Sequence, residues 1–284
     1  MDWTQYYTVT HPNETTQNWA SFYSKVIAMT KDARNKLHNR LNINYAADND
    51  PKHTLDLYFP IKAKNAPVYI FLHGGGFREG TKDEYGYVAI PFSTRKVITV
   101  VPNYSWAPER PYPSQIDDIR DVLSWIYHNI GSMGGDPTQI YLGGHSAGAI
   151  ITASVALDSS WKLKRGLPID VVKGCFPISG WYDLRKFIKM ELIGLYFSDP
   201  SSAEAASPIL NINTPPQDNL IAVGDKETVL LEPSKNLVEQ LSKKGVRAKL
   251  LVLEGLDHAD TALALGDIDG TLVQEILKII WLAG

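Results

Sequence analysis

The sequence has a single cysteine, Cys175, among its 284 residues. One thiol cannot form an intrachain disulfide and cannot supply a thiolate cluster for a metal ion. We therefore expect neither a disulfide framework nor a metal site. Cys175 lies in the apolar run "VVKGCFPIS". Free cysteines in such surroundings are usually buried, so we predict a buried core thiol.

Long apolar runs, leader-like features and basic clusters are also lacking. No run of 18 apolar residues occurs, and the opening "MDWTQYYTVTHPNE" has neither a basic nor an apolar region. We therefore expect no membrane span, no secretory signal and a cytoplasmic protein. The net charge is −3 and the basic residues are scattered, which argues against a nucleic-acid or anionic-membrane partner. Repeats and Gly/Ser linkers are missing too, which favours a single domain over residues 1–284.

What the sequence does contain is an alternation of short apolar strands with helical patterns. Residues 67–73, 97–102 and 139–144 are almost wholly apolar, as are strands buried on both faces of a parallel sheet. Residues 114–128 have helical periodicity. The alternation predicts an α/β fold with one mostly parallel sheet covered by helices on both faces. Further strands are predicted over 41–46, 53–60, 171–179, 219–224 and 248–255, and further helices within 15–38 and over 146–157, 233–245 and 271–283.

In such sheets, ligands bind at the carboxyl ends of the strands. "GHSAG", Gly144 to Gly148, follows one predicted strand and opens a helix. The pattern G-x-S-x-G in this context is typical of a nucleophile elbow, a strained turn that raises the serine hydroxyl at the helix N-terminus. Ser146 is therefore the predicted nucleophile. The alternative is an ordinary Gly-rich turn with a helix-capping serine.

"HGGGF", His73 to Phe77, follows another buried strand. Three successive glycines leave backbone N–H groups unobstructed, and acyl transfer needs such donors to bind the oxyanion of its tetrahedral intermediate. We predict that the N–H groups of Gly75, Gly76 and Ala147 form this hole, with a flexible turn as the alternative. His73 is expected to brace the loop rather than to transfer protons.

The nucleophile needs a base, and seven histidines are available. Only His258, in "EGLDHAD", follows the last strong strand and can reach Ser146 from a strand end. We predict that His258 is the base. His145 is expected only to pack beside the nucleophile. The remaining histidines other than His73 precede the sheet core or lie on a helix: His11, His38, His53 and His128.

Together these motifs resemble the α/β-hydrolase superfamily. The similar blocks lie within residues 53–282 and include "LDLYFP", "FLHGGGF", "NYSWAPERPYPSQIDD", "GGDPTQIYLGGHSAGA", "ISGWYDL", "ASPIL" and "GLDH". They look like the HGGG-bearing esterases, which include hormone-sensitive-lipase-like carboxylesterases and the kynurenine formamidase branch. "NYSWAPERPYP" and "HGGGF" look like the esterases, whereas "SGWYDL" and Lys82 look like the formamidase branch. The resemblance implies a Ser–acid–His triad.

In the family's chain order, the acid lies between the nucleophile and the base. Resembling sequences commonly carry it three residues after the glycine that ends a strand. After Gly224 that position is Glu227, a Glu where the family commonly has Asp. Asp225 is its rival. Asp257 is a poor candidate because neighbouring side chains diverge, and Glu232 is interpreted as a first-turn helix acid.

The predicted reaction is hydrolysis of a carboxylic ester of a small or aryl substrate through an acyl-enzyme, without a cofactor. The alternatives are an arylformamidase that hydrolyses an N-formylkynurenine-type amide, and a non-catalytic ligand-binding protein on the same fold. Residues 1–40 and the insert 181–210 are expected to cover the site, and the sequence permits a homodimer. Aromatic residues near strand ends are expected to line the pocket or, alternatively, to pack the cap: Phe77, Tyr104, Trp106, Trp181, Tyr182 and Tyr196.

Overall fold

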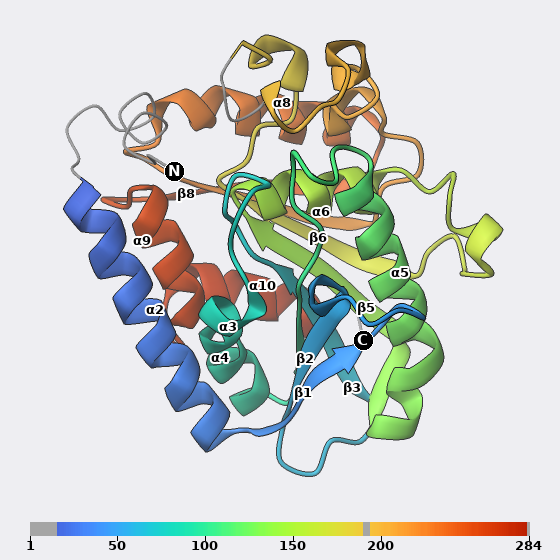
Figure 1. The fold of residues 1–284 in the computed structure, drawn as a ribbon, viewed down its shortest axis with the longest axis vertical. Coiled ribbons are helices and arrows are strands. Elements are labelled where there is room, and N and C mark those ends of the chain that lie inside the picture. Colours follow the sequence, from blue (N-terminus) through green and yellow to red (C-terminus); the bar gives the residue numbers. More distant parts are fainter. Residues whose placement is uncertain (1–15, 190–193, 283–284) are drawn as a thin grey trace.

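The computed structural model describes residues 16–189 and 194–282, which form one eight-stranded sheet between two layers of helices (Figure 1). The strand order is β1-β2-β4-β3-β5-β6-β7-β8. β2 is antiparallel to both of its neighbours, and every neighbouring pair from β4 to β8 is parallel. The predicted fold class is confirmed. The strands are β1 (His38–Asn44), β2 (Thr54–Phe59), β3 (Ala66–Leu72), β4 (Ile98–Pro102), β5 (Gly135–His145), β6 (Val172–Ile178), β7 (Asp218–Gly224) and β8 (Arg247–Leu253).

Helices cover both faces of this sheet (Figure 1). On one face the sheet packs against α5, α6 and α8, and on the other against α2, α4, α9 and α10. Because helices cover both faces, we expect ligands to bind at the carboxyl ends of the strands. The described α-helices are α2 (Thr16–Lys36), α3 (Lys82–Tyr85), α4 (Ala89–Thr94), α5 (Ser114–Asn129), α6 (Ala147–Leu157), α8 (Thr228–Lys243), α9 (His258–Leu263) and α10 (Thr271–Leu282).

The central strands are apolar because both of their sides are buried. Along β3, Val68 and Ile70 join the core beneath one helical layer, and Tyr69 and Phe71 join the core beneath the other. Full burial of a large apolar side chain contributes about 1.5–3 kcal/mol. Cys175 of β6 is buried as predicted, and burial raises the pKa of its thiol.

One helix begins earlier than the sequence predicts. We expected a helix from Pro233 because proline favours the first turn, but α8 begins at Thr228 and contains Pro233 in its interior. The first turn closes ahead of the proline, because the amides of Leu230 and Leu231 both donate to the carbonyl of Glu227. Glu227 is thus the N-cap residue, directly before the helix.

A second helix, α9, is not predicted at all. It has only six residues, too few to show a helical period. Asp257 caps its N-terminus by accepting the amide of Asp260 at 2.9 Å, and the Asp260 side chain accepts the amide of Asp257. His258 is therefore the first residue of a helix rather than part of a loop.

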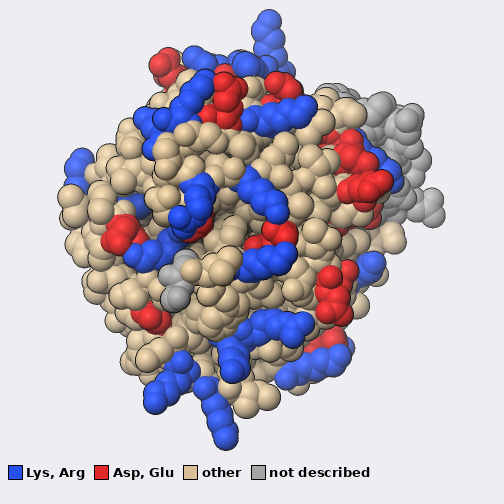
Figure 2. Space-filling view, turned by 180° about the vertical axis from the view of Figure 1, so that it is seen from behind, with Lys and Arg blue, Asp and Glu red and all other residues tan. Residues whose placement is uncertain are grey.

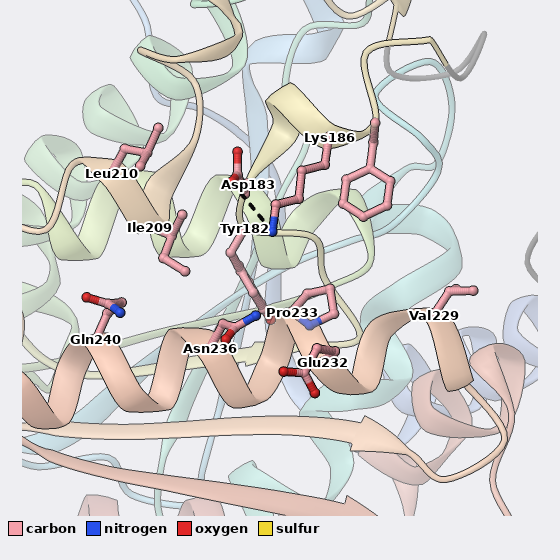
Figure 3. A pocket seen from close by; sticks show the side chains of 11 residues that line it. Tyr182, Asp183, Lys186, Ile209, Leu210, Val229, Glu232, Pro233, Asn236 and Gln240 are labelled. Atoms are coloured by element: carbon pink, nitrogen blue, oxygen red, sulfur yellow. Dashed lines mark ion pairs between the residues drawn. The ribbon is translucent and has the colours of Figure 1, made fainter.

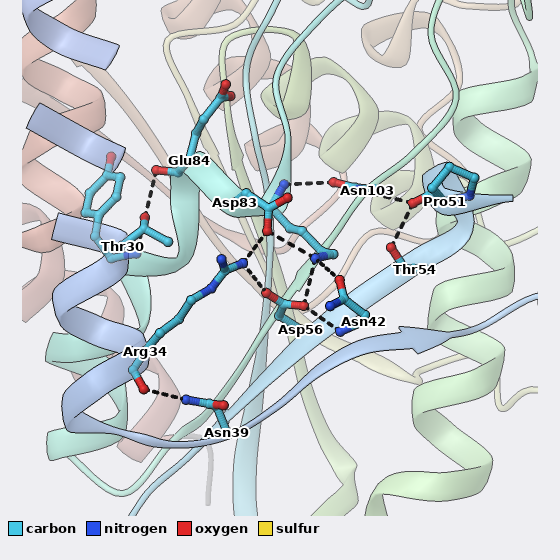
Figure 4. A network of polar contacts seen from close by, with 12 residues as sticks. Thr30, Arg34, Asn39, Asn42, Pro51, Thr54, Asp56, Asp83, Glu84 and Asn103 are labelled. Carbon is cyan, nitrogen blue, oxygen red and sulfur yellow. Dashed lines mark hydrogen bonds and ion pairs between the residues drawn. The ribbon is translucent and has the colours of Figure 1, made fainter. Parts of the chain in front are cut away.

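A buried network of charges attaches α2 to the sheet (Figure 4). Arg34 of α2 lies 2.8 Å from Asp56 of β2 and also contacts Asp83 of α3. The Lys82 ammonium lies 3.0 Å from Asp56 Oδ1 and donates to Asn42 Oδ1 at 2.6 Å. Asp56 and Lys82 are both buried, so loss of either partner would leave an unpaired group in the interior.

The two expected cap segments are described only in part. Residues 1–15 of the first and 190–193 of the second lie outside the described ranges. In α2, the Tyr23 hydroxyl donates to Glu79 at 2.7 Å, which links the helix to the segment that follows the glycine loop. The described part of the insert contains three short 3-10 turns, Leu184–Lys186, Pro200–Ala203 and Pro208–Leu210.

The surface carries both signs of charge. On the face in Figure 2, Lys and Arg side chains lie among Asp and Glu side chains. Glu275, for example, pairs with Lys249 at 2.6 Å and with Lys278 at 2.7 Å. No helix within residues 16–189 and 194–282 is long and apolar enough to cross a lipid bilayer.

Candidate active site

Four parallel strands bring the candidate residues to one edge of the sheet. β3 leads into the glycine loop at residues 73–77, and β5 leads into Ser146. β7 leads into the loop that contains Glu227, and β8 leads into the loop before His258. Because parallel strands end at the same edge, segments far apart in the sequence meet there.

Ser146 occupies a strained turn between β5 and α6. Its φ of 56° and ψ of −121° are unfavourable for a residue with a side chain. The Ser146 amide donates to the carbonyl of Ile178 in β6 at 2.9 Å, which holds the turn against the sheet. The glycines two residues before and two residues after Ser146 are required, because a side chain at either position would clash with the backbone. A Cβ at Gly144 would lie 2.5 Å from the carbonyl oxygen of Gly148, and one at Gly148 would lie 2.2 Å from that of Leu72.

The structure brings together Ser146, His258 and Glu227. His258 Nε2 lies 2.9 Å from Ser146 Oγ, and His258 Nδ1 lies 2.5 Å from Glu227 Oε1. The three residues are 5%, 3% and 1% exposed, in that order. A serine, an imidazole and a carboxylate are thus joined in series within a site shielded from water, where electrostatic interactions are strong.

The two candidate acids lie in different surroundings. Glu227 Oε2 accepts the amide of Gly224 at 2.6 Å and the hydroxyl of Ser179 at 2.7 Å, which leaves Oε1 directed at His258. Asp225 is exposed, and its Oδ1 accepts the amide of Gly255 at 2.8 Å, so it braces the turn after β8. Glu232 lies in the second turn of α8, not the first, and pairs loosely with Lys235 at 3.9 Å.

The glycine loop lies against the serine turn. A Cβ at Gly74 would lie 3.2 Å from the Cβ of Ser146. Gly75 has a φ of 125°, and a Cβ there would lie 2.0 Å from the carbonyl oxygen of Glu79, so this position requires glycine. Within the described residues, the amides of Gly75, Gly76 and Ala147 donate to no protein acceptor.

A family model described as the alpha/beta hydrolase fold matches residues 69–261. This chain belongs to the α/β-hydrolase fold family. The resemblance inferred from the motifs is thereby confirmed.

The chain is similar to several known proteins. One is an isoprenylcysteine α-carbonyl methylesterase of Arabidopsis thaliana, 28% identical over 235 residues that cover 75% of this chain and 55% of that protein. Another is a kynurenine formamidase of Salmo salar, 27% identical over 264 residues that cover 88% and 85% of the two chains. A hyperthermophilic esterase from Pyrobaculum calidifontis has the same fold, with a TM-score of 0.75 at 21% identity over 96% of this chain and 95% of that chain. The chain spans between 55% and 61% of the lengths of the first plant relatives it matches.

His73 braces the glycine loop. Its Nδ1 lies 2.7 Å from the carbonyl oxygen of Gly74, and its ring stacks on Tyr104 with centroids 4.3 Å apart. The Tyr104 hydroxyl donates to the His73 carbonyl at 2.7 Å. Burial lowers the pKa of His73 to about 4, so the imidazole is neutral near pH 7. Tyr104, expected in the pocket, is thus committed to this support.

His145 does more than pack beside Ser146. Its Nε2 lies 3.0 Å from the carbonyl oxygen of His258 and 3.1 Å from Thr261 Oγ1. Burial and the neighbouring His258 ring lower its pKa well below the usual value. Ser179 and Thr261, which no sequence motif predicts, also lie here. The Ser179 hydroxyl donates to Glu227, and the Thr261 hydroxyl contacts both Ser179 and the carbonyl of His258.

The other aromatic residues expected to line the pocket lie in separate places. Phe77 stacks on Tyr196 with centroids 3.8 Å apart, which joins the glycine loop to the insert. Trp181 packs against Phe187 at 5.6 Å. Trp106 is half-buried beneath the ammonium of Lys52, which lies 4.2 Å from its ring centre, and Tyr182 is buried.

A cavity of about 570 Å³ lies between α8 and the insert (Figure 3). Figure 3 shows Val229, Pro233 and Asn236 projecting from α8 toward Ile209 and Lys186 of the insert. The residues that line it also include Tyr182, Asp183, Phe187, Leu210, Glu232 and Gln240.

Proposed function

We propose that this protein is a serine hydrolase that cleaves a carboxylic ester of a small or aryl substrate. The observation that carries the proposal is the buried series from Ser146 Oγ through His258 to Glu227, with contacts of 2.9 Å and 2.5 Å. A serine hydroxyl is a weak nucleophile unless an adjacent base removes its proton. His258 is within reach of that proton, and Glu227 is within reach of the opposite ring nitrogen.

In the proposed reaction, His258 Nε2 takes the proton of Ser146 as the serine oxygen attacks the ester carbonyl. Glu227 holds the Nδ1–H tautomer and stabilises the imidazolium that forms. The alkoxide oxygen of the tetrahedral intermediate binds to the amides of Gly75, Gly76 and Ala147, where each donor contributes about 3 kcal/mol.

Collapse of this intermediate breaks the ester bond, and the imidazolium of His258 gives its proton to the leaving alcohol. An acyl group is then attached to Ser146 Oγ. Water attacks this acyl-enzyme while His258 again takes a proton, and the second tetrahedral intermediate releases a carboxylic acid and restores the serine. The residues proposed for these steps need no cofactor and no metal.

The aromatic side chains beside the loops support a small or aryl substrate. Phe77 and Tyr196 join the glycine loop to the insert, and Trp181 follows β6 near the same edge. Residues 1–40 and 181–210 are proposed to cover this site. Planar rings held rigidly around a polar centre favour substrates with flat or short apolar groups over long flexible chains.

An arylformamidase activity is the second candidate. The kynurenine formamidase of Salmo salar matches 88% of this chain and 85% of its own length, more evenly than the plant methylesterases do. Lys82 is a feature that resembles the formamidase branch, but it adds no separate support for this activity. Its ammonium binds Asp56 and Asn42. Ser146 would attack a formamide carbonyl by the same steps, with His258 and Glu227 in the same roles.

A substrate panel tests both candidates. It contains p-nitrophenyl acetate and butyrate, aryl carbamates, N-formylkynurenine and the methyl ester of an S-prenylated cysteine. We expect p-nitrophenyl acetate to have a higher kcat/KM than N-formylkynurenine, and the reverse order would favour the formamidase. Ser146→Ala is the control, with fluorophosphonate labelling of the folded wild type as a second measurement. Undiminished turnover in Ser146→Ala would disprove the mechanism, and lack of labelling would favour a non-catalytic binding protein.

A further inference from the structure

Two hydroxyl groups outside the proposed triad form a buried link between its acid and its base. The Ser179 hydroxyl donates to Glu227 Oε2 at 2.7 Å, and Ser179 Oγ lies 2.9 Å from Thr261 Oγ1. Thr261 Oγ1 in turn lies 3.0 Å from the carbonyl oxygen of His258. Ser179 follows β6 and Thr261 lies in α9, and both are buried. The link therefore joins the β7–α8 loop to the helix that begins at His258.

The backbone at Ser179 is held in an unusual conformation. Its φ of 56° lies in the left-handed region, which costs a residue with a side chain about 1–2 kcal/mol. The Ser179 amide donates to the carbonyl of Ala222 in β7 at 2.9 Å, so the neighbouring strand holds it there. The strained residue is thus the one that directs a hydroxyl at Glu227.

The protons in this link can be assigned from the acceptors. The carbonyl of His258 can only accept, and Thr261 has one hydroxyl proton for two neighbouring oxygens. If Thr261 donates to Ser179, then His145 Nε2–H satisfies the carbonyl of His258 at 3.0 Å. Ser179 gives its only proton to Glu227, so Thr261 must supply the proton of the 2.9 Å contact with Ser179, and that arrangement holds. In this arrangement His145 is the neutral Nε2–H tautomer, which agrees with its lowered pKa.

Glu227 has one methylene more than an aspartate and therefore one more torsion to fix. Its Oε2 is held by two donors, the amide of Gly224 at 2.6 Å and the hydroxyl of Ser179 at 2.7 Å. The amide alone anchors one atom, around which the carboxylate plane can turn. The second donor, from a different strand end, fixes that plane, so Oε1 stays directed at His258 Nδ1.

We propose that Ser179 and Thr261 are positioning residues, which act through Glu227 and His258 and contact no reacting atom. This inference rests on the proposed serine hydrolase function. A hydrogen bond to a charged group in a buried network is among the stronger ones in proteins, and here it fixes the geometry of the base. Removal of the Ser179 hydroxyl should lower kcat about 10- to 100-fold with KM nearly unchanged, since only the transition state depends on the imidazolium.

The test compares Ser179→Ala, Thr261→Val and Thr261→Ser on p-nitrophenyl acetate. We expect the first two to lower kcat, with the larger effect at Ser179, and Thr261→Ser to restore the hydroxyl and most of the rate. The matched controls are Ser93→Ala and Thr152→Val, whose buried hydroxyls have no hydrogen-bond partner among the described residues. These controls should keep kcat within about twofold of the wild type.

A double variant separates positioning from general damage. Ser179→Ala made in a Glu227→Gln background should cause no further loss, because the hydroxyl acts through the carboxylate. If it lowers kcat in that background by the same factor as in the wild type, Ser179 acts independently of Glu227 and the inference is wrong.

A measurement without turnover distinguishes this inference from the proposed function. The His258 Nδ1 proton, shared with Glu227, should give a far-downfield ¹H NMR resonance, assigned by its loss in His258→Ala. It should move or broaden in Ser179→Ala and stay in place in Ser93→Ala. An unmoved resonance together with an unchanged kcat would overturn the positioning role. Turnover that does not depend on Ser146 would overturn the proposed function, whatever the resonance does.

Discussion

Replacement of Glu227 by glutamine is the sharpest test of the proposed acid. In the structure, Oε2 accepts the amide of Gly224 at 2.6 Å, while Oε1 faces His258 Nδ1 at 2.5 Å. A glutamine has only one oxygen, and the backbone amide of Gly224 cannot turn away. The carboxamide oxygen should therefore take the Oε2 position, because an NH₂ group there would face an N–H donor.

The NH₂ group of that glutamine would then face His258 Nδ1. It would favour the tautomer that carries its proton on Nε2, and this tautomer cannot accept the proton of Ser146. An amide in place of a triad acid lowers kcat about 10⁴-fold in the serine protease example. We expect a loss of kcat/KM of about 10³- to 10⁴-fold for Glu227→Gln, which corresponds to about 4–5.5 kcal/mol of transition-state stabilisation.

The assay is p-nitrophenyl acetate hydrolysis at pH 7.5, with Asp225→Asn as the matched control. Asp225 Oδ1 accepts the amide of Gly255 at 2.8 Å, and an asparagine oxygen can accept the same bond. Asp225→Asn should therefore keep kcat/KM within about threefold of the wild type. The reasoning fails if Asp225→Asn loses as much activity as Glu227→Gln, or if Glu227→Gln stays within about tenfold of the wild type.

Three other substitutions test the support of the site. Gly75→Ala places a Cβ 2.0 Å from the Glu79 carbonyl oxygen, so the loop must shift and kcat should fall about 100-fold or more, while far-UV circular dichroism stays native. Lys82→Met leaves the buried Asp56 with one cationic partner and should lower the free energy of unfolding in urea by about 3 kcal/mol, against about 0.5 kcal/mol for the exposed Lys278→Met. A loss below about 1 kcal/mol for Lys82→Met would contradict this. The pKa of His73 is lowered to about 4, so between the unfolded value near 6.5 and pH 4 the unfolded chain binds more protons and stability falls as the pH falls. From pH 7 to pH 4.5 the wild type should lose about 2 kcal/mol more than His73→Gln, and equal slopes would refute this.

The sequence predicts the parts of the site that are local. The buried strands are visible as apolar runs, and the turn at Ser146 needs small neighbours that are adjacent in the chain. Glu227 could be ranked above Asp225 only by spacing, because both acids follow the same strand. The fold separates them, since one accepts the amide at the strand end and the other is exposed.

Ser179 and Thr261 could not be predicted, because their contact joins positions 82 residues apart. A serine after a strand and a threonine in a six-residue helix carry no periodic signal. The start of α8 at Thr228 was hidden for a related reason. Pro233 is a strong local signal for the first turn of a helix. The helix instead starts after Glu227, and tertiary contacts with Gly224 and His258 fix the position of Glu227.

The buried thiol of Cys175 has a practical consequence for experiments on this protein. Its shielding and raised pKa leave it in the unreactive thiol form, so maleimide reagents should find no target in the folded wild type. A cysteine introduced at Val229, which is 43% exposed on the first turn of α8, would then be a unique attachment point for a fluorophore or spin label. Such a reporter would sit two residues from Glu227 and would follow movements of the insert across the cavity without any other change to the chain.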